Sequence, residues 1–139
     1  MSEISNVFLP NEEIFETLKA YVEEKSTYEV WVGRNKVKEQ NNVVVFEETN
    51  NLLQSYSTTF DDTTRALSYN IEVYCNKNED NYDAVKQISI LILEVMQDYY
   101  KMIGGINAIM PDFDSKNKDS YRATLRFTKS FKPNRNKLI

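Results

Sequence analysis

Acidic side chains are the first candidates for catalytic groups in this sequence. Two adjacent pairs stand out, Glu47/Glu48 and Asp61/Asp62. Glycoside and phosphoryl chemistry needs two carboxylates that converge in a cleft and have separated pKa values. Because adjacent residues of a strand point to opposite faces, neither pair converges by itself. We therefore interpret both pairs as solvated loop charge.

A further group of acidic and amide side chains resembles a loose calcium-binding loop. It consists of Asp112, Asp114, Asn117 and Asp119. An EF-hand loop requires the pattern D-x-[DN]-x-[DN]-G and a glutamate at its twelfth position. Lys116 occupies the third ligand position here and no glycine follows, so we interpret this group as an ordinary hairpin turn.

Histidine is absent, and Cys75 is the only cysteine. The lack of histidine excludes His-based acid–base catalysis and triads that contain His. It also removes the usual zinc and iron ligands. Cys75 lies in an alternating strand pattern, which favours a small buried thiol over a reactive one. We expect no catalytic residue, no metal site and no cofactor, so an enzyme is the least favoured class.

Positive charge is concentrated at the C-terminal end. Residues 116–139 carry eight Lys and Arg against Asp119 alone, a balance of +7, and the net charge of −4 then leaves −11 for residues 1–115. A basic end on an acidic body can hold nucleic acid or dock on the acidic body of a neighbouring copy. Arg122 and Arg126 share the polar face of an expected strand, and Lys129, Arg135 and Lys137 are expected to extend the same basic strip. Contact with another subunit and an ordinary surface ion pair with Glu72 are equally open alternatives for the two arginines. Contact with DNA is a third, less favoured alternative.

The first helix is expected over residues 11–24. Apolar residues recur there at steps of three and four, which gives one apolar face. They are Ile14, Leu18, Tyr21 and Val22. Asn11 is the expected N-cap, since asparagine favours that position.

The second and stronger helix is expected over about residues 81–103. Asp80 is the expected N-cap and Gly104-Gly105 the expected stop. The apolar stripe is wider than one sheet face needs, so the helix is either deeply buried or has a second face for another copy. The stripe comprises Val85, Ile88, Ile92, Val95, Tyr99 and Met102, widened by Ile90, Leu91, Leu93 and Met96.

Five segments have the composition or alternation of strands. They are residues 28–32, 43–46, 66–75, 106–110 and 121–128. Residues 33–42 are expected to form a loop or a hairpin tip, and residues 47–64 a long polar loop of the kind that is usually functional or mobile. The short links between 106 and 128 favour an antiparallel hairpin.

These elements predict one α+β domain over residues 1–139. We expect a mixed or antiparallel sheet of about four to five strands with two helices packed on one face. The expected core is about 11–131, with a flexible basic tail over 132–139. No apolar run is long enough for a membrane span, and the N-terminal residues lack the pattern of a signal peptide. We expect a soluble, intracellular protein.

Several strings, taken in order, resemble a known family. They are Val43 to Glu48, Thr58-Thr59, Leu67 to Tyr74, Met102 to Gly104 and Tyr121 to Phe127. Together they look like the tail-terminator or tail-completion proteins of phages and phage-derived particles of Gram-positive bacteria. The resemblance covers roughly residues 11–131 and rests on element order and short strings, not on a catalytic signature.

The resemblance implies a structural virion protein that is not an enzyme. Such proteins form a homo-oligomeric ring, typically a hexamer, at the head-proximal end of the tail, after assembly in the bacterial host cytoplasm. The implied partners are further copies, the tail tube protein and the head–tail connector protein, with DNA only in passage and no membrane. A head–tail joining (neck) protein is the alternative, and a small nucleic-acid-binding module is the alternative of another class.

Mapped onto this chain, the resemblance makes the loop 47–64 and the tail 129–139 the expected contacts. Together with the arginines of the last strand, the expected contact residues are Arg122, Arg126, Lys129, Lys132, Arg135, Lys137, Thr58, Phe60 and Asp61.

Overall fold

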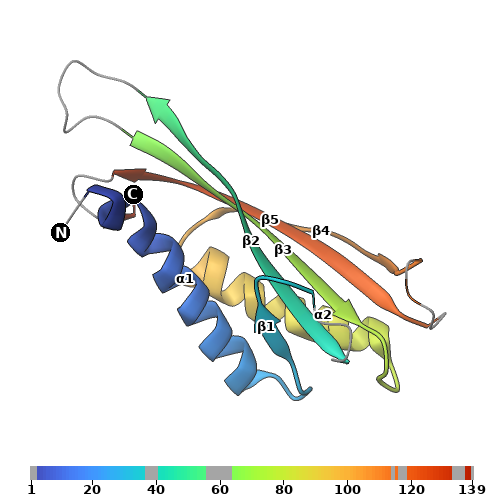
Figure 1. Cartoon of the computed structure of the whole chain (residues 1–139). Coiled ribbons are helices and arrows are strands. Elements are labelled where there is room, and N and C mark those ends of the chain that lie inside the picture. The colour runs from blue at the N-terminus through green and yellow to red at the C-terminus, as the bar shows by residue number, and fades with distance from the viewer. Residues whose placement is uncertain are drawn as a thin grey trace.

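The computed structural model describes residues 3–36, 41–55, 64–113, 115, 119–132 and 137–138, with side chains described within 11–36, 41–49, 67–113, 115 and 119–130. The elements are α1 (Glu3–Lys25), β1 (Trp31–Gly33), β2 (Asn42–Ser55), β3 (Thr64–Cys75), α2 (Asn81–Leu93), η2 (Glu94–Tyr99), β4 (Ile103–Pro111), β5 (Tyr121–Lys132) and β6 (Lys137–Leu138). Both helices lie on one face of the sheet (Figure 1). The predicted α+β class is confirmed.

The strands form one mixed sheet in the order β1-β2-β3-β5-β4, and β6 pairs with β5. β1 and β2 are parallel, and the other pairs are antiparallel. The antiparallel hairpin predicted between 106 and 128 is confirmed as the β4–β5 pair. The hairpin-tip alternative for residues 33–42 is wrong, because a hairpin cannot join parallel strands.

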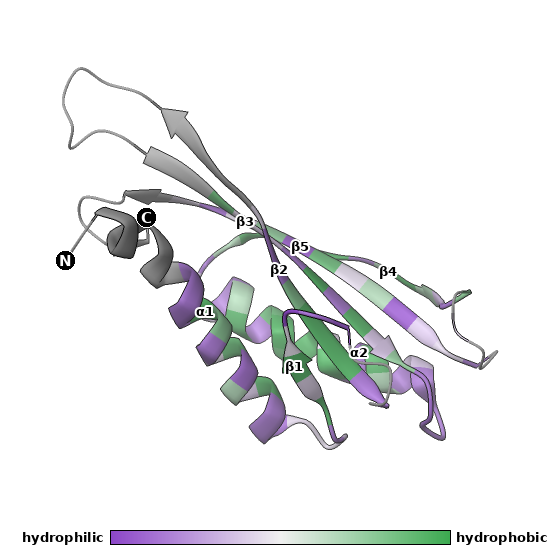
Figure 2. Cartoon of the chain, in the orientation of Figure 1, coloured by the Kyte–Doolittle hydropathy of each residue, from purple (hydrophilic) through white to green (hydrophobic). Residues whose placement is uncertain are grey.

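The core lies between the sheet and the helices. Alternation along β3 was predicted correctly, since Leu67, Tyr69, Ile71, Val73 and Cys75 are all buried. They meet the apolar stripes of α1 and α2, on which Leu18 and Ile88 are fully buried. Burial of one such side chain stabilises the fold by about 1.5–3 kcal/mol. Figure 2 shows hydrophobic residues where the layers meet and hydrophilic residues on the exposed side of α1.

The start of α2 follows the prediction, but its end does not. The Asp80 carboxylate accepts a 3.1 Å hydrogen bond from the Asp83 backbone N–H, as an N-cap does. After Leu93 the helix widens into the π-helix η2, which ends at Tyr99 with Tyr100 as its C-cap. Lys101 adopts the left-handed conformation (φ 58°) that usually ends a helix at glycine. The predicted Gly104-Gly105 stop is therefore wrong, and both glycines lie in β4.

The start of α1 also differs from the prediction. The helix begins at Glu3 and continues through Pro10, so Asn11 is not an N-cap. The Asn11 side chain is 3% exposed and forms hydrogen bonds with the sheet instead of with the first helical turn.

The polar stretch 47–64 is not a single loop. β2 continues to Ser55 and pairs with β3 as far as Thr64, with register shifts after Glu48 and after Leu53. Main-chain pairing with β3 keeps this polar sequence extended. Residues 56–63 lie outside the described residues. β6 lies inside the segment predicted as a flexible tail and pairs with Phe131 and Lys132 of β5.

Among the described residues, no helix is long and apolar enough to cross a membrane.

Candidate interaction surface

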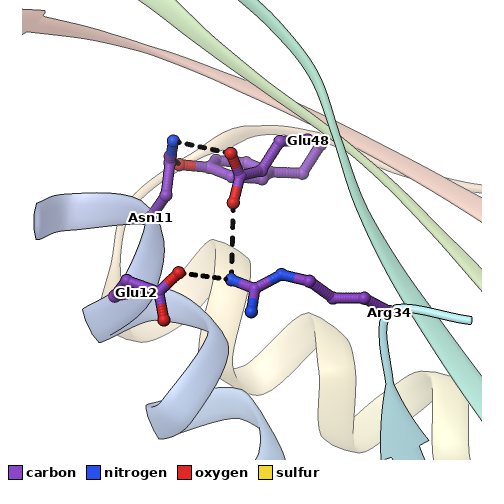
Figure 3. Close-up of polar contacts among 5 residues, drawn as sticks. Asn11, Glu12, Arg34 and Glu48 are labelled. Carbon is purple, nitrogen blue, oxygen red and sulfur yellow. Dashed lines mark hydrogen bonds and ion pairs between the residues drawn. The ribbon is translucent and has the colours of Figure 1, made fainter. Parts of the chain in front are cut away.

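A chain of polar contacts joins α1 to the sheet (Figure 3). Asn11 Nδ2 donates a 3.0 Å hydrogen bond to Glu48 Oε2, and the Tyr69 hydroxyl donates to Asn11 Oδ1. The other Glu48 carboxylate oxygen lies 3.4 Å from Arg34 Nη2. The same guanidinium nitrogen donates a 2.8 Å hydrogen bond to Glu12. We call Asn11, Glu12, Arg34, Glu48 and Tyr69 the α1–sheet network.

The inner end of the α1–sheet network is buried. Asn11 and Tyr69 are 3% and 1% exposed. Burial, with the nearby Glu48 charge, raises the pKa of the Tyr69 phenol well above its ordinary value. The phenol therefore keeps its proton and acts as a donor. Asn11 is suited to its place because one amide supplies both an acceptor for Tyr69 and a donor for Glu48.

The outer end of the network is held by charge. Arg34 bridges two carboxylates, and its guanidinium carbon lies 4.2 Å from the centre of the Phe15 ring. A cation over an aromatic face is attracted by the ring. The arginine thus ties the segment after β1 to α1 and β2.

The α1–sheet network lies at the point where the β2–β3 pair first shifts its register. Glu48 lies opposite Tyr69 in the register, directly before the first register shift of β2. Beyond this point β2 and β3 continue past the end of α2 (Figure 1). We call residues 50–55 of β2 and 64–68 of β3 the arm. The network fixes the base of the arm to α1.

The sheet face opposite the helices carries two of the predicted contact residues. Arg126 is exposed, and its Nε lies 3.4 Å from Asn70 Oδ1. Arg122 is half-buried and lies opposite Tyr74 in the register. The strand alternation that predicted this outward face is correct, and both arginines lie on it, four residues apart along β5.

Glu72, the expected ion-pair partner of these arginines, is engaged elsewhere. It lies opposite Thr124 in the register and accepts a hydrogen bond from the Tyr74 hydroxyl. Burial and this hydrogen bond raise the pKa of Tyr74 to about 12, while the Arg122 charge acts in the opposite direction. Lys36 Nζ lies 3.9 Å from the centre of the Tyr74 ring.

A shallow groove of about 540 Å³ surrounds Arg126 on the outer face. Glu47, Ser68 and Thr128 contribute polar groups, and Ile103 of β4 contributes an apolar side chain that is 75% exposed. Thr49 adds a hydroxyl and Asn70 an amide to this open groove, and such a mixture of charged and polar groups suits polar contact with another protein surface. They do not form a closed reaction site.

Lys129 does not belong with Arg122 and Arg126. It is half-buried on the helix-covered side, where its Nζ donates a 2.5 Å hydrogen bond to the Tyr100 backbone carbonyl. Burial, followed by the nearby Lys101 charge, lowers its pKa. The prediction that Lys129 extends the strip of the two arginines is wrong, because successive residues of a strand alternate between faces.

The other predicted contact residues are only partly described. The backbones of Lys132 and Lys137 face each other in the β5–β6 pair, and their side chains are outside the described residues. Thr58, Phe60, Asp61 and Arg135 lie outside the described residues entirely.

The acidic side chains that were considered as candidates for catalysis or metal binding do not lie together in one site. Glu47 and Glu48 are both exposed but lie in β2, so the interpretation of this pair as loop charge is wrong, and Glu48 is also bound in the α1–sheet network. Asp61/Asp62 and Asp114 are outside the described residues. Within the described part of the chain, no three His, Cys, Asp or Glu side chains gather as a metal site requires.

The sequence did not lead us to predict that three residues form one connected set of hydrogen bonds, namely Asn11, Glu48 and Tyr69. Tyr69 was correctly assigned to the inward face of β3. An asparagine on the inward side of a helix was the available signal for a buried polar contact, because buried polar groups need partners.

A scan against protein-family models gave no match for this chain, and a search of curated proteins gave none either.

Proposed function

We propose that this chain is a structural protein of a phage tail or a phage-derived tail-like particle. In this proposal it forms a ring, a tail terminator, at the head-proximal end of the tail tube. The proposal rests on the resemblance of its strings to that family and on one structural observation. That observation is the arm, which continues past α2 from a base held by the α1–sheet network.

β5 pairs with β3 along the arm as far as Arg65, so three strands continue past α2. A strand projection with a fixed base suits a protein that must contact neighbours at a set distance. Buried polar networks in which each member is satisfied rigidify the structure around them. Here the network joins three elements, α1, β2 and β3, where the arm begins. An arm held in this way can reach the tube or a neighbouring subunit without refolding of the body.

The side chains that could do chemistry have other roles in this proposal. Glu48 is held by Asn11 and Arg34, and Tyr69 keeps its proton. Burial raises the pKa of the Cys75 thiol to about 12, so little reactive thiolate is present at neutral pH. These observations favour an assembly protein over an enzyme.

Light scattering tests the proposal directly. The purified protein, alone and with tail tubes, is expected to form a discrete assembly of several copies. A strict monomer at high concentration under both conditions would contradict it.

A nucleic-acid-binding module is the second candidate, and Arg122 and Arg126 on the open face of β5 favour it. It predicts DNA binding that weakens steeply with salt, because each phosphate contact releases counterions. Filter binding at low salt decides between the two, since a ring protein that only surrounds passing DNA should retain little of it.

A further inference from the structure

Lys129 is a charged side chain that the proposed function does not yet use. It lies opposite Leu67 in the β3–β5 register, at the base of the arm. Leu67 is fully buried, so both side chains lie on the face that the helices cover, and not on the outer face that carries Arg126. A lysine rarely turns inward unless its ammonium group finds a partner. The partner of Lys129 therefore indicates what this residue does.

That partner is the end of η2. Lys129 Nζ donates a 2.5 Å hydrogen bond to the backbone carbonyl of Tyr100, the C-cap of η2. The last carbonyls of a helix have no partner within the helix, and a lysine near that end can supply one. Its positive charge also complements the negative end of the helix dipole. The contact therefore stabilises the helix end and joins it to β5.

Tyr100 is itself held in place. It is 6% exposed, and its hydroxyl donates a 3.0 Å hydrogen bond to Thr17 Oγ1 of α1. Its backbone N–H donates to the Val95 carbonyl of η2 at 3.0 Å. Lys129 is therefore attached to a point that both α1 and η2 fix in the body of the protein.

The geometry at the end of η2 is unusual. The helix is a π-helix there, and Lys101 follows it in the left-handed conformation (φ 58°). Such conformations cost energy and persist where their surroundings hold them. Gln97 Nε2 holds this corner with a 2.6 Å hydrogen bond to the Gly104 carbonyl. Burial and the nearby Lys101 charge lower the pKa of Lys129, so the contact of Lys129 with the helix end is kept against both effects.

The α1–sheet network holds the other side of the same base. Glu48 of β2 reaches α1 through Asn11, whereas Lys129 of β5 reaches the end of η2. β3 lies between β2 and β5 in the sheet. The three strands that enter the arm are therefore tied to the helix layer through both outer strands.

We infer that Lys129 is a positioning residue for the arm, which it braces from β5 against the end of η2. Without this contact β5 remains paired with β3, but the base of the arm is held from the β2 side alone. The arm then opens locally more often and is less fixed in direction. The inference rests on the proposed function for the purpose of the arm, while the brace itself is a property of the single chain.

Amide hydrogen exchange tests the brace, with Lys129→Met as the variant. Methionine keeps an unbranched apolar side chain and removes the ammonium donor. The amides of residues 65–67 and 129–131 are expected to exchange about fivefold faster or more, because local opening no longer breaks a hydrogen bond from a charged group. Lys86→Met is the matched control, since Lys86 is exposed on α2 and forms no ion pair with a described residue. It should leave these rates unchanged.

A second control separates positioning from a loss of overall stability. Ile88→Val removes a methyl group from the core and lowers the free energy of global unfolding. It should accelerate the most protected core amides but not the arm amides, which exchange by local opening. If Lys129→Met leaves the arm amides at their wild-type rates, the inference is overturned. It is also overturned if Ile88→Val accelerates the arm amides as much as Lys129→Met does.

Binding of the same labelled variants to tail tubes separates this inference from the proposed function. Lys129→Met is expected to bind about fivefold more weakly than the wild type and Lys86→Met, because an arm without its brace must be ordered on binding. Accelerated arm exchange with unchanged binding would overturn the positioning role. If the wild type binds but Lys129→Met shows no accelerated exchange, the brace is wrong and the proposed function stands. If exchange is accelerated but the wild type does not bind, the brace stands and the proposed function is wrong.

Discussion

Asn11 Nδ2 lies 3.0 Å from Glu48 Oε2 and joins the middle of α1 to the point where β2 first shifts its register. The same asparagine accepts a hydrogen bond from Tyr69, which faces Glu48 across the strand pair. One buried amide thus connects three elements at the base of the arm.

Replacement of Asn11 by alanine is expected to lower the free energy of unfolding by about 2–3 kcal/mol. The substitution leaves the buried Tyr69 hydroxyl without its acceptor and removes a donor from Glu48, and unsatisfied buried groups cost about this much. Urea denaturation measures the loss. Glu12→Gln is the matched control, because its ion pair with Arg34 is exposed and such pairs contribute less than about 1 kcal/mol.

A double variant tests whether this loss comes from the hydrogen bond. Tyr69→Phe in the Asn11→Ala background should cost less than the sum of the two single substitutions, since residues in one network are coupled. Strictly additive losses would show that Asn11 acts through some other contact.

Gly104→Ala is expected to destabilise the protein by about 3 kcal/mol or more. Gly104 has a φ of +134°, and a Cβ there would lie 2.0 Å from the Arg126 backbone oxygen. Strain of this kind adds to the loss of β4–β5 pairing. At Gly105 the nearest atom to an added Cβ is Gln97 Nε2, 3.3 Å away at the end of a flexible side chain. Equal thermal stability of Gly104→Ala and Gly105→Ala would contradict this account.

The stability of the fold is expected to fall at alkaline pH. Burial raises the pKa of Cys75 from 9.0 to about 12, and burial with the Glu72 hydrogen bond raises that of Tyr74 from 10.0 to about 12. The folded state holds both protons more tightly than the unfolded state. The stabilisation is therefore complete below the unfolded values and is lost as pH rises toward the folded ones.

Denaturation across that alkaline interval measures the effect. Cys75→Ala should show a smaller loss between neutral and alkaline pH than the wild type, because one of the groups with a raised pKa is absent. In the native protein at neutral pH, Cys75 should also react with a thiol reagent far more slowly than in urea. Rapid reaction of the native thiol would show that it is not buried.

Alanine substitutions of Lys129 and Arg126 are expected to change the stability of the fold by different amounts. Lys129→Ala should cost about 1 kcal/mol, because it removes a charged donor from a carbonyl at the C-terminal end of a helix. Arg126→Ala should change stability by no more than about 0.5 kcal/mol, as is usual at exposed positions. If Arg126 serves in contacts between proteins, its substitution should weaken assembly instead. Thermal melts and light scattering of the same two variants measure both properties.

Much of the fold was predictable because local signals agreed with the tertiary structure. The alternation from Leu67 to Cys75 fixed the inward face of β3, and Asp80 capped α2 as expected. Where local and tertiary signals competed, prediction failed. Gly104-Gly105 has the composition of a helix stop, but Lys101 adopts the left-handed conformation earlier, and the close approach of β5 requires glycine at 104.

The base of the arm was not predictable for a related reason. The sequence around Glu48 is polar and suggests a loop, yet backbone pairing with β3 keeps it in a strand. Asn11 suits an N-cap by residue type, and only the positions of Glu48 and Tyr69 in space reveal its role. Contacts between residues far apart in sequence leave little local pattern. The outward face of Arg122 and Arg126, by contrast, followed directly from strand alternation.

The central claim is that copies of this chain assemble at one end of a tail tube. Electron microscopy of tail tubes incubated with the labelled protein tests it most directly. The account predicts label at the head-proximal end of each tube, as a ring of several copies. Label on the head side of the connector would instead indicate a neck protein. Label spread along the tube, or no bound label, would contradict the claim.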